Sequence, residues 1–234
     1  MSQQPLRVLR VSFALPPGYD ATLLPKLRGA IAEKAGLEHD EFHNHNNADD
    51  AAVAFLYRYP RIQYRLHNDA LLLVCLNEGI DALQHFFAQP DWTLALHTGE
   101  SISLRISDLK LYETAPEVVA APQGYQLRNW YALNQENYAR YQSLQTIDAR
   151  RLFLQHLIVN QIVLFMREFD CEATQPVVVN IERFYTNFHE HKGRKVKVFD
   201  IHFTANVLLP HHIGLGKATA MGFGALIGAH RKKL

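Results

Sequence analysis

Apolar and polar residues alternate over several short segments in the first half of the chain. In one of them, Leu9, Val11 and Phe13 fall on one face, and mostly polar residues fall on the other. This period of two is typical of a strand that is buried on one face. The segments with a strand pattern are 7–13, 61–66, 70–76, 92–97 and 102–112. One of them, 70–76, is apolar throughout, which predicts a strand covered on both faces.

Two helices are predicted between these strands. Apolar residues recur at helical spacing from Leu23 to Ile31, and Gly36 can end that helix. A second helical pattern begins at Ile80 and is ended by Pro90. The order strand, helix, strand, strand, helix, strand, with one added strand, is the ferredoxin-like arrangement. It predicts one antiparallel sheet with helices on one face, and it leaves the other face available for binding.

The second half of the chain repeats this order imperfectly. Strand patterns occur at 125–133, 176–184, 195–209 and 223–228, and a long, mostly buried helix is predicted over 148–169. Its apolar stripe runs from Leu152 to Met166, and the residues at helical spacing from Leu154 to Phe165 widen it. The second helix of the repeat is missing or reduced to the short stretch His211-His212-Ile213. A glycine-rich stretch stands in its place.

A connection marked by proline and glycine, at 115–124, separates the two halves. We therefore expect two domains, 1–120 and 121–234. The expected fold class is α+β, with two tandem ferredoxin-like domains whose antiparallel sheets carry helices on one face.

The composition is that of an ordinary globular protein. Of the 234 residues, 48% are hydrophobic and 20% are charged, which is enough to build a sizeable core. The formal net charge is only +1, so any affinity for nucleic acid must come from local basic patches. The polar N-terminus lacks the apolar core of a signal peptide, and no apolar run approaches the ~18 residues of a membrane span. With two cysteines read as free thiols, we expect a cytoplasmic protein without a membrane partner.

Four of the twelve glycines fall between Gly214 and Gly224. Such a stretch can point several N–H groups in one direction and form an anion nest that suits a phosphate. Two familiar phosphate motifs do not fit, because Lys217 is followed by Ala218, and because Thr219 stands where a dinucleotide fingerprint needs its third glycine. The alternative is a tight structural turn where a loop packs under a sheet.

This order of residues near a C-terminus resembles the glycine-rich loop of the repeat-associated mysterious protein (RAMP) superfamily. More narrowly, it resembles the CRISPR-associated endoribonucleases that process precursor CRISPR RNA. The duplicated ferredoxin-like order extends the resemblance over nearly the whole chain. The resemblance implies a metal-independent endoribonuclease without a cofactor, which cleaves CRISPR repeat RNA through attack by the 2′-hydroxyl and leaves 2′,3′-cyclic phosphate and 5′-hydroxyl ends.

The resemblance implies CRISPR repeat RNA as the partner. It leaves open subunits of a CRISPR effector complex, or a second copy of this chain, as further partners. One alternative function is a non-catalytic RNA-binding RAMP subunit of such a complex, and a more remote one is a structural protein unrelated to RNA.

In the family, the catalytic histidine follows the first helix and is preceded by a hydrophobic residue. Phe42-His43 fits this pattern, and His45 lies two residues further on, so both histidines are candidates. Histidine near neutral pH can act as general base or general acid in RNA cleavage. The alternative is a polar, solvated loop. A metal site is a weaker interpretation, because the two histidines lack a defined second pair of ligands.

Basic residues are concentrated beside the strand at 61–66 and in the run 189–197. On the strand, the polar side chains alternate with apolar ones, which is equally consistent with an ordinary solvent-exposed face and with RNA contact. A basic hairpin in the second domain could contact the phosphates of a stem-loop. The residues predicted to bind RNA are Arg58, Arg61, Arg65, Lys192, Arg194, Lys195, Lys197, Gly214, Gly216, Lys217, Gly222 and Gly224.

Overall fold

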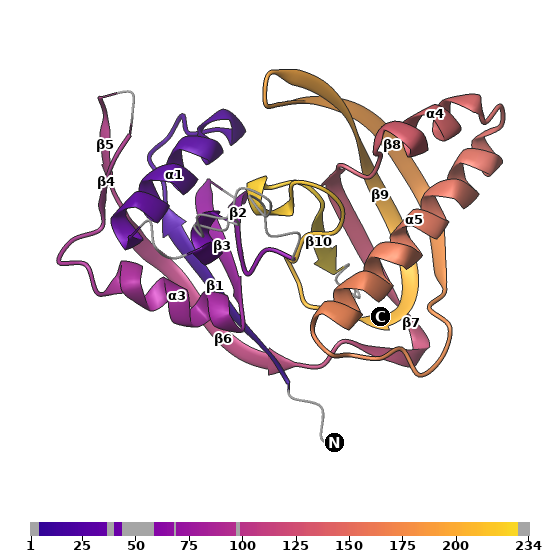
Figure 1. Ribbon diagram of the computed structural model, residues 1–234, viewed down its shortest axis with the longest axis horizontal. Helices are drawn as coiled ribbons and strands as arrows, with labels where there is room; N and C mark the ends of the chain where they lie inside the picture. The colour runs from indigo at the N-terminus through magenta and orange to yellow at the C-terminus, as the bar shows by residue number, and fades with distance from the viewer. Residues whose placement is uncertain (1–4, 37–39, 44–58, 68, 97–98, 229–234) are drawn as a thin grey trace, which may run out of the picture. The chain divides into compact units, whose positions relative to one another are not determined.

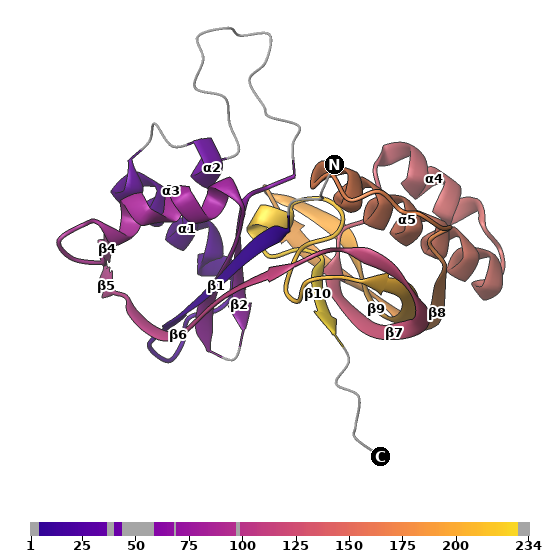
Figure 2. The same ribbon diagram turned by 90° about the horizontal axis from the view of Figure 1, so that it is seen from below.

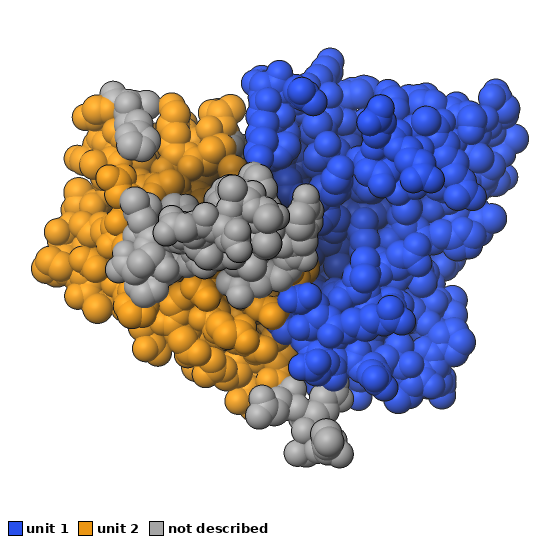
Figure 3. All heavy atoms as spheres, viewed as in Figure 1, with its two compact units in different colours: residues 1–4, 115–219, 223–234 blue, residues 5–114, 220–222 orange. Residues whose placement is uncertain are grey.

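The computed structural model describes residues 5–36, 40–43, 59–67, 69–96 and 99–228. These residues fall into two compact units, coloured separately in Figure 3. The N-terminal unit comprises 5–114 together with 220–222, and the C-terminal unit comprises 115–219 together with 223–228.

The N-terminal unit contains a four-stranded antiparallel sheet. Its strands are β1 (Leu6–Ala14), β2 (Ile62–His67), β3 (Ala70–Leu76) and β6 (Arg105–Thr114). They lie in the order β2-β3-β1-β6, so β1 pairs with β3 on one side and with β6 on the other. This is the ferredoxin-like order predicted from the sequence.

Helices cover one face of this sheet (Figures 1 and 2). They are the 3-10 helix η1 (Ala21–Leu23) and the α-helices α1 (Leu24–Ala35), α2 (Asp40–His43) and α3 (Glu78–Phe87). Leu9, Val11 and Phe13 of β1 belong to the same hydrophobic core as Leu27 of α1 and Phe86 of α3. The alternating pattern of β1 therefore buries its apolar face under the two longer helices.

Two expectations for this unit are wrong. The strand β2 is not half-buried, because all four residues from Ile62 to Arg65 are buried. The second face of the sheet is also not left free along β1 and β3, since Val8, Leu72 and Val74, which alternate with the core-facing residues, are buried as well.

The added strand of this unit also differs from the prediction. The pattern at 92–97 forms a short strand, β4 (Thr93–Ala95), which pairs only with β5 (Ser101–Ser103) among the described strands. The segment 102–112 is not one continuous strand, because it breaks between β5 and β6. There, the N–H of Leu104 donates to the carbonyl oxygen of Trp92 at 3.0 Å.

The C-terminal unit contains a second antiparallel sheet in the order β10-β7-β9-β8. Its strands are β7 (Glu117–Trp130), β8 (Val179–His191), β9 (Arg194–Leu208) and β10 (Ala225–Gly228). The predicted connection at 115–124 is largely part of β7, with an irregular pairing between Val118 and Gln123. Pro122 lies within this irregularity, as expected for a residue that has no N–H to donate to a ladder.

The described part of this unit contains two α-helices, and the sequence predicted only one of them. Helix α4 (Gln135–Ser143) is capped by Asn134, whose side chain accepts a hydrogen bond from the N–H of Asn137 at 2.7 Å. Helix α5 (Ile147–Glu168) is capped by Thr146. The only buried residue of α4 is Tyr141, so the helix has no apolar stripe that would indicate it.

Helix α5 lies along one face of the sheet (Figure 1). The residues that widen its predicted apolar stripe are buried; they are Leu154, Ile158, Ile162 and Phe165. The other positions, from Leu152 to Met166, are buried only at their C-terminal end, because Leu152 is 52% exposed and Met166 is 1% exposed. Between the end of β9 and Gly224 the described chain forms no α-helix, only the 3-10 helix η3 (Thr219–Met221). None of the helices in the described ranges is long and apolar enough to cross a membrane.

Two glycines on helices of the N-terminal unit should respond in opposite ways to alanine. A Cβ at Gly79 would lie 2.7 Å from the carbonyl carbon of Arg61, whereas a Cβ at Gly29 would have no neighbour within 4 Å. We expect Gly79→Ala to lower the free energy of unfolding by about 1–3 kcal/mol. Gly29→Ala should raise it by about 0.5–1 kcal/mol, because alanine loses less conformational entropy in a helix. Urea unfolding of both variants tests this packing, and a Gly79→Ala protein as stable as Gly29→Ala would contradict it.

Candidate nucleic-acid interface

The hairpin formed by β8 and β9 carries the densest group of basic residues. His191 pairs with Arg194 across a two-residue turn, and both turn residues, Lys192 and Gly193, have positive φ angles of 51° and 70°. Two consecutive positive φ angles are the mark of the tight hairpin turns that match the twist of the strands. Lys192, Arg194 and Lys195 are exposed at this end of the hairpin. The turn therefore presents three cations to solvent.

Further along β9, Lys197 is half-buried among aromatic rings. Its Nζ lies 5.2 Å from the ring centroid of Tyr141 and 5.3 Å from that of Tyr138, both on α4. Lys195 lies over the ring of Phe188 at 5.1 Å. Each of these ammonium groups thus lies within cation–π distance of at least one ring. The negative face of an aromatic ring attracts a cation placed over it, so these contacts help to orient the lysine side chains.

The glycine-rich stretch closes on itself and on the end of β7. The N–H of Leu215 donates to the carbonyl oxygen of Gly224 at 2.9 Å, and the N–H of Lys217 donates to that of Tyr131 at 2.9 Å. The N–H of Gly224 donates to the carbonyl oxygen of Asn129 at 3.1 Å. Because these three N–H groups already have backbone acceptors, they are not available for the anion nest that the sequence suggested.

Close packing explains why glycine is needed at several of these positions. Gly216 has a φ of +96°, and a Cβ there would lie 2.8 Å from both Trp130 Nε1 and the Tyr131 carbonyl oxygen. Gly224 has a φ of +66°, and a Cβ there would overlap the carbonyl oxygen of Leu215. Gly222, within the N-terminal unit, has a φ of +88°, and its Cβ would lie 2.8 Å from a methyl carbon of Leu24. These glycines have a structural role, while their contact with RNA stays a prediction.

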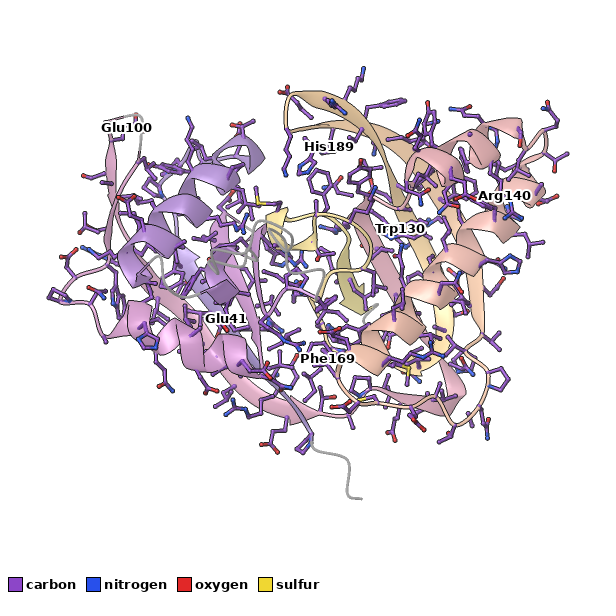
Figure 4. All side chains as sticks on the ribbon, viewed as in Figure 1. Glu41, Glu100, Trp130, Arg140, Phe169 and His189 are labelled. Carbon is purple, nitrogen blue, oxygen red and sulfur yellow. The ribbon has the colours of Figure 1, made fainter. Side chains whose placement is uncertain are left out.

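The hairpin and the glycine-rich stretch meet in a cluster of rings in the C-terminal unit. The ring of His191 contacts Phe223 with centroids 5.3 Å apart, and both rings lie about 6 Å from the ring of Tyr131, at 6.1 and 6.0 Å. Lys217 Nζ lies 5.1 Å from the Tyr131 centroid. Partial burial, with Lys192 and Lys217 nearby, lowers the pKa of His191 below its usual value. In Figure 4, His189 marks the hairpin and Trp130 the adjoining end of β7.

Arg61 and Arg65 of the N-terminal unit lie in a different environment, because both side chains are largely buried. Arg65 is only 3% exposed, and its guanidinium donates to the side-chain oxygen of Gln63 at 2.7 Å. Loss of solvent lowers the pKa of Arg65 to about 10, and Tyr59 opposes this shift. Arg61 forms an ion pair with Glu78, with Nε 3.1 Å from the carboxylate. Of the two interpretations of this segment, an ordinary solvent-exposed face is therefore wrong for Arg65, and contact of these arginines with RNA stays a prediction.

Among the predicted catalytic residues, His43 is the last residue of α2. Its side chain, and the whole of His45 and Arg58, lie outside the described residues. Phe42, which precedes it, is buried at 1% exposure and fixes this end of the short helix in the hydrophobic core. The backbone position of His43 is thus set by packing of its neighbour.

Arg28 of α1 makes a polar contact with α2 that was not predicted from the sequence. Its Nε donates to the carbonyl oxygen of Phe42 at 3.2 Å, and its NH1 group lies 3.2 Å from the sulfur of Met221, in the segment 220–222 of the same unit. Burial lowers the pKa of Arg28 from its usual value. Arg28 follows Leu24 by four residues, so the two lie on the same, inward face of the helix. A charged residue on that face is the feature of the sequence that could have indicated the contact.

Two family models match the chain, one in each half. The Cas6b N-terminal domain matches residues 4–115, and the Cas6b C-terminal domain matches residues 118–229. Among curated proteins, the uncharacterised protein MJ0978 of Methanocaldococcus jannaschii is 26% identical over 98 residues. That match spans 42% of this chain and 66% of MJ0978, so the chain covers just under two thirds of that relative.

Solved structures share the fold at low sequence identity. A crystal structure of Cas6b matches with a TM-score of 0.81 at 21% identity. A crystal structure of the CRISPR RNA processing endoribonuclease Cas6b matches with a TM-score of 0.71 at 19% identity. Each of these two matches covers 97% of this chain and 100% of the matched chain. A RAMP protein binding different RNA substrates has a TM-score of 0.53 at 11% identity and covers 96% of this chain and 100% of its own. The predicted tandem ferredoxin-like fold is thereby confirmed. Because the two Cas6b domain models together cover nearly the whole sequence, the chain belongs to the Cas6b family.

Proposed function

We propose that this protein is an endoribonuclease that binds CRISPR repeat RNA and cleaves it once, and so processes precursor CRISPR RNA. The observation that carries the proposal is the match of both Cas6b domains, in order, over the two halves of the chain. The shared fold with a solved CRISPR RNA processing endoribonuclease supports it.

We assign RNA binding mainly to the C-terminal unit. Lys192, Arg194 and Lys195 are exposed at the hairpin turn, and Lys217 of the glycine-rich stretch is exposed nearby in the same unit. Cations of this kind contact phosphates and supply affinity that depends little on sequence. Arg65 is not assigned to RNA, because its buried guanidinium already donates to Gln63.

We assign the proton transfers to the histidines that follow α1. Attack by a 2′-hydroxyl needs a base for its proton and an acid for the leaving 5′-oxygen, and imidazole can do either near neutral pH. His43 directly follows the buried Phe42, whose carbonyl oxygen Arg28 holds, so a rotation of α2 would disturb both contacts. The products would carry 2′,3′-cyclic phosphate and 5′-hydroxyl ends, and histidine chemistry of this kind needs no metal ion.

Replacing the candidate histidines should separate chemistry from binding. We expect His43→Ala or His45→Ala to lower the single-turnover cleavage rate of repeat RNA by roughly 10²- to 10⁴-fold, because proton transfer acts mainly in the transition state. RNA affinity should change little. His156→Ala, an exposed histidine on α5, is the matched control. Near-unchanged cleavage by the His43, His45 double variant would remove this site from the mechanism.

Replacing the hairpin cations should have the reverse effect. Lys192→Ala, Arg194→Ala and Lys195→Ala should weaken RNA binding, and each should reduce the slope of log affinity against log salt by about 0.7–0.9 if that residue contacts one phosphate. The cleavage rate of the saturated complex should change little. Lys26→Ala removes another exposed cation, on α1, and serves as control. A salt slope that is identical for the hairpin variants and Lys26→Ala would disprove the phosphate contacts.

Alanine at Gly216 should test the role of the glycine-rich stretch. The new Cβ would displace the stretch from Trp130 and Tyr131, and with it Lys217, so we expect both the melting temperature and RNA affinity to fall. Gly18 also has a positive φ, +93°, but has open space around it. Gly18→Ala therefore controls for backbone strain alone. If the Gly216→Ala protein folded and kept full RNA affinity, the glycine-rich stretch would be only a structural turn and would have no role in RNA binding.

A further inference from the structure

An exposed group of aromatic rings and lysines lies where α4 meets the β8–β9 hairpin. Tyr138 is 42% exposed and Phe188 is 52% exposed, although both are large rings. Lys197 Nζ lies 5.3 Å from the Tyr138 centroid and 5.6 Å from that of Phe188, and Lys195 Nζ lies 5.1 Å from the latter. We call these four residues the aromatic–lysine patch.

The patch rests on a rigid base. Tyr141, one helical turn after Tyr138, is only 4% exposed, and its ring lies 5.4 Å from Phe199 and 6.3 Å from Phe153. Across the hairpin, Phe188 pairs directly with Lys197 in the strand register. The backbone that carries the two exposed rings is therefore held by a buried tyrosine on α4 and by a strand ladder in the hairpin. The rings themselves each have only two side-chain torsions to order when a ligand binds.

The chemistry of the patch fits nucleic acid better than protein. Ring faces that remain in water can stack on bases, and lysines beside them can neutralise the adjoining phosphates. An apolar protein surface would instead have to desolvate Lys197 and Lys195 without offering either a counter-charge. Bases inside a duplex are already stacked on one another, so the bases that can use these rings are unpaired.

We propose that the aromatic–lysine patch binds single-stranded RNA by stacking unpaired bases on Tyr138 and Phe188, with Lys195 and Lys197 on the flanking phosphates. This deepens the proposed function, on which it rests, because it gives the RNA an unpaired segment next to the part that contacts the hairpin turn. Helix α4, which the sequence did not indicate, acquires a role in this way.

Two fluorescent probes of equal charge test the proposal on the full chain. One is a 12-residue oligoadenylate, and the other is a 12-residue abasic ribose-phosphate oligomer that has the same phosphates and no bases. Tyr138→Leu and Phe188→Leu keep apolar bulk but remove the ring face. We expect each to weaken oligoadenylate binding by about 5- to 100-fold and to leave binding of the abasic oligomer unchanged. Lys197→Gln should weaken binding of both probes.

Tyr185→Leu is the matched control, because Tyr185 is 56% exposed on β8 but alternates to the face opposite Phe188. It should bind both probes as the unchanged protein does. The proposal would be overturned if Tyr138→Leu and Phe188→Leu weakened binding of both probes equally or weakened binding of neither. It would also be overturned if the unchanged protein showed no detectable binding of oligoadenylate. Cleavage of repeat RNA by the unchanged protein is measured separately. If the protein cleaves repeat RNA but the patch variants bind oligoadenylate normally, the patch proposal fails while the proposed activity stands.

Discussion

The C-terminal unit depends on a close backbone approach between the glycine-rich stretch and the end of β7. Three hydrogen bonds, from Leu215, Lys217 and Gly224 to backbone carbonyls, tie the stretch to itself and to Asn129 and Tyr131. They can form only because Gly216 and Gly224 adopt positive φ angles where a Cβ would collide with neighbouring atoms. One consequence is the position of Lys217, whose ammonium lies over Tyr131 in the ring cluster with His191 of the hairpin. A backbone constraint thereby gathers the basic groups that we assign to RNA.

Charged groups in the interior of the N-terminal unit have a different role. Arg28 and Arg65 are largely removed from water, which lowers the pKa of both. Such burial is costly unless the guanidinium keeps its hydrogen bonds, and Arg65 keeps one to Gln63 while Arg28 keeps one to the carbonyl oxygen of Phe42. The latter contact holds the short helix that ends at His43. We therefore regard Arg28 as a support of the candidate catalytic segment and the hairpin cations as the groups that meet phosphate.

The sequence predicted the parts of the fold that periodicity determines. The strand around Val11 follows from alternation, the strand around Leu73 from a continuous apolar run, and the hairpin turn at Lys192 from its turn residues. Helix α4 could not be predicted, because one buried tyrosine creates no stripe. The burial of Arg65 was equally hidden, since alternation shows which side chains share a face but not what covers that face. The catalytic assignment came only from the family resemblance, because two histidines in a polar stretch carry no distinctive spacing.

We propose above all that this chain alone cleaves CRISPR repeat RNA by histidine-assisted attack of the 2′-hydroxyl. The most direct measurement is incubation of the purified protein with the repeat RNA of its own CRISPR array in excess EDTA, with analysis of both new ends. The account predicts a single cut that persists in the chelator and leaves a 2′,3′-cyclic phosphate and a 5′-hydroxyl. No cleavage, or cleavage that stops in EDTA and returns with Mg²⁺ or Mn²⁺, would contradict it.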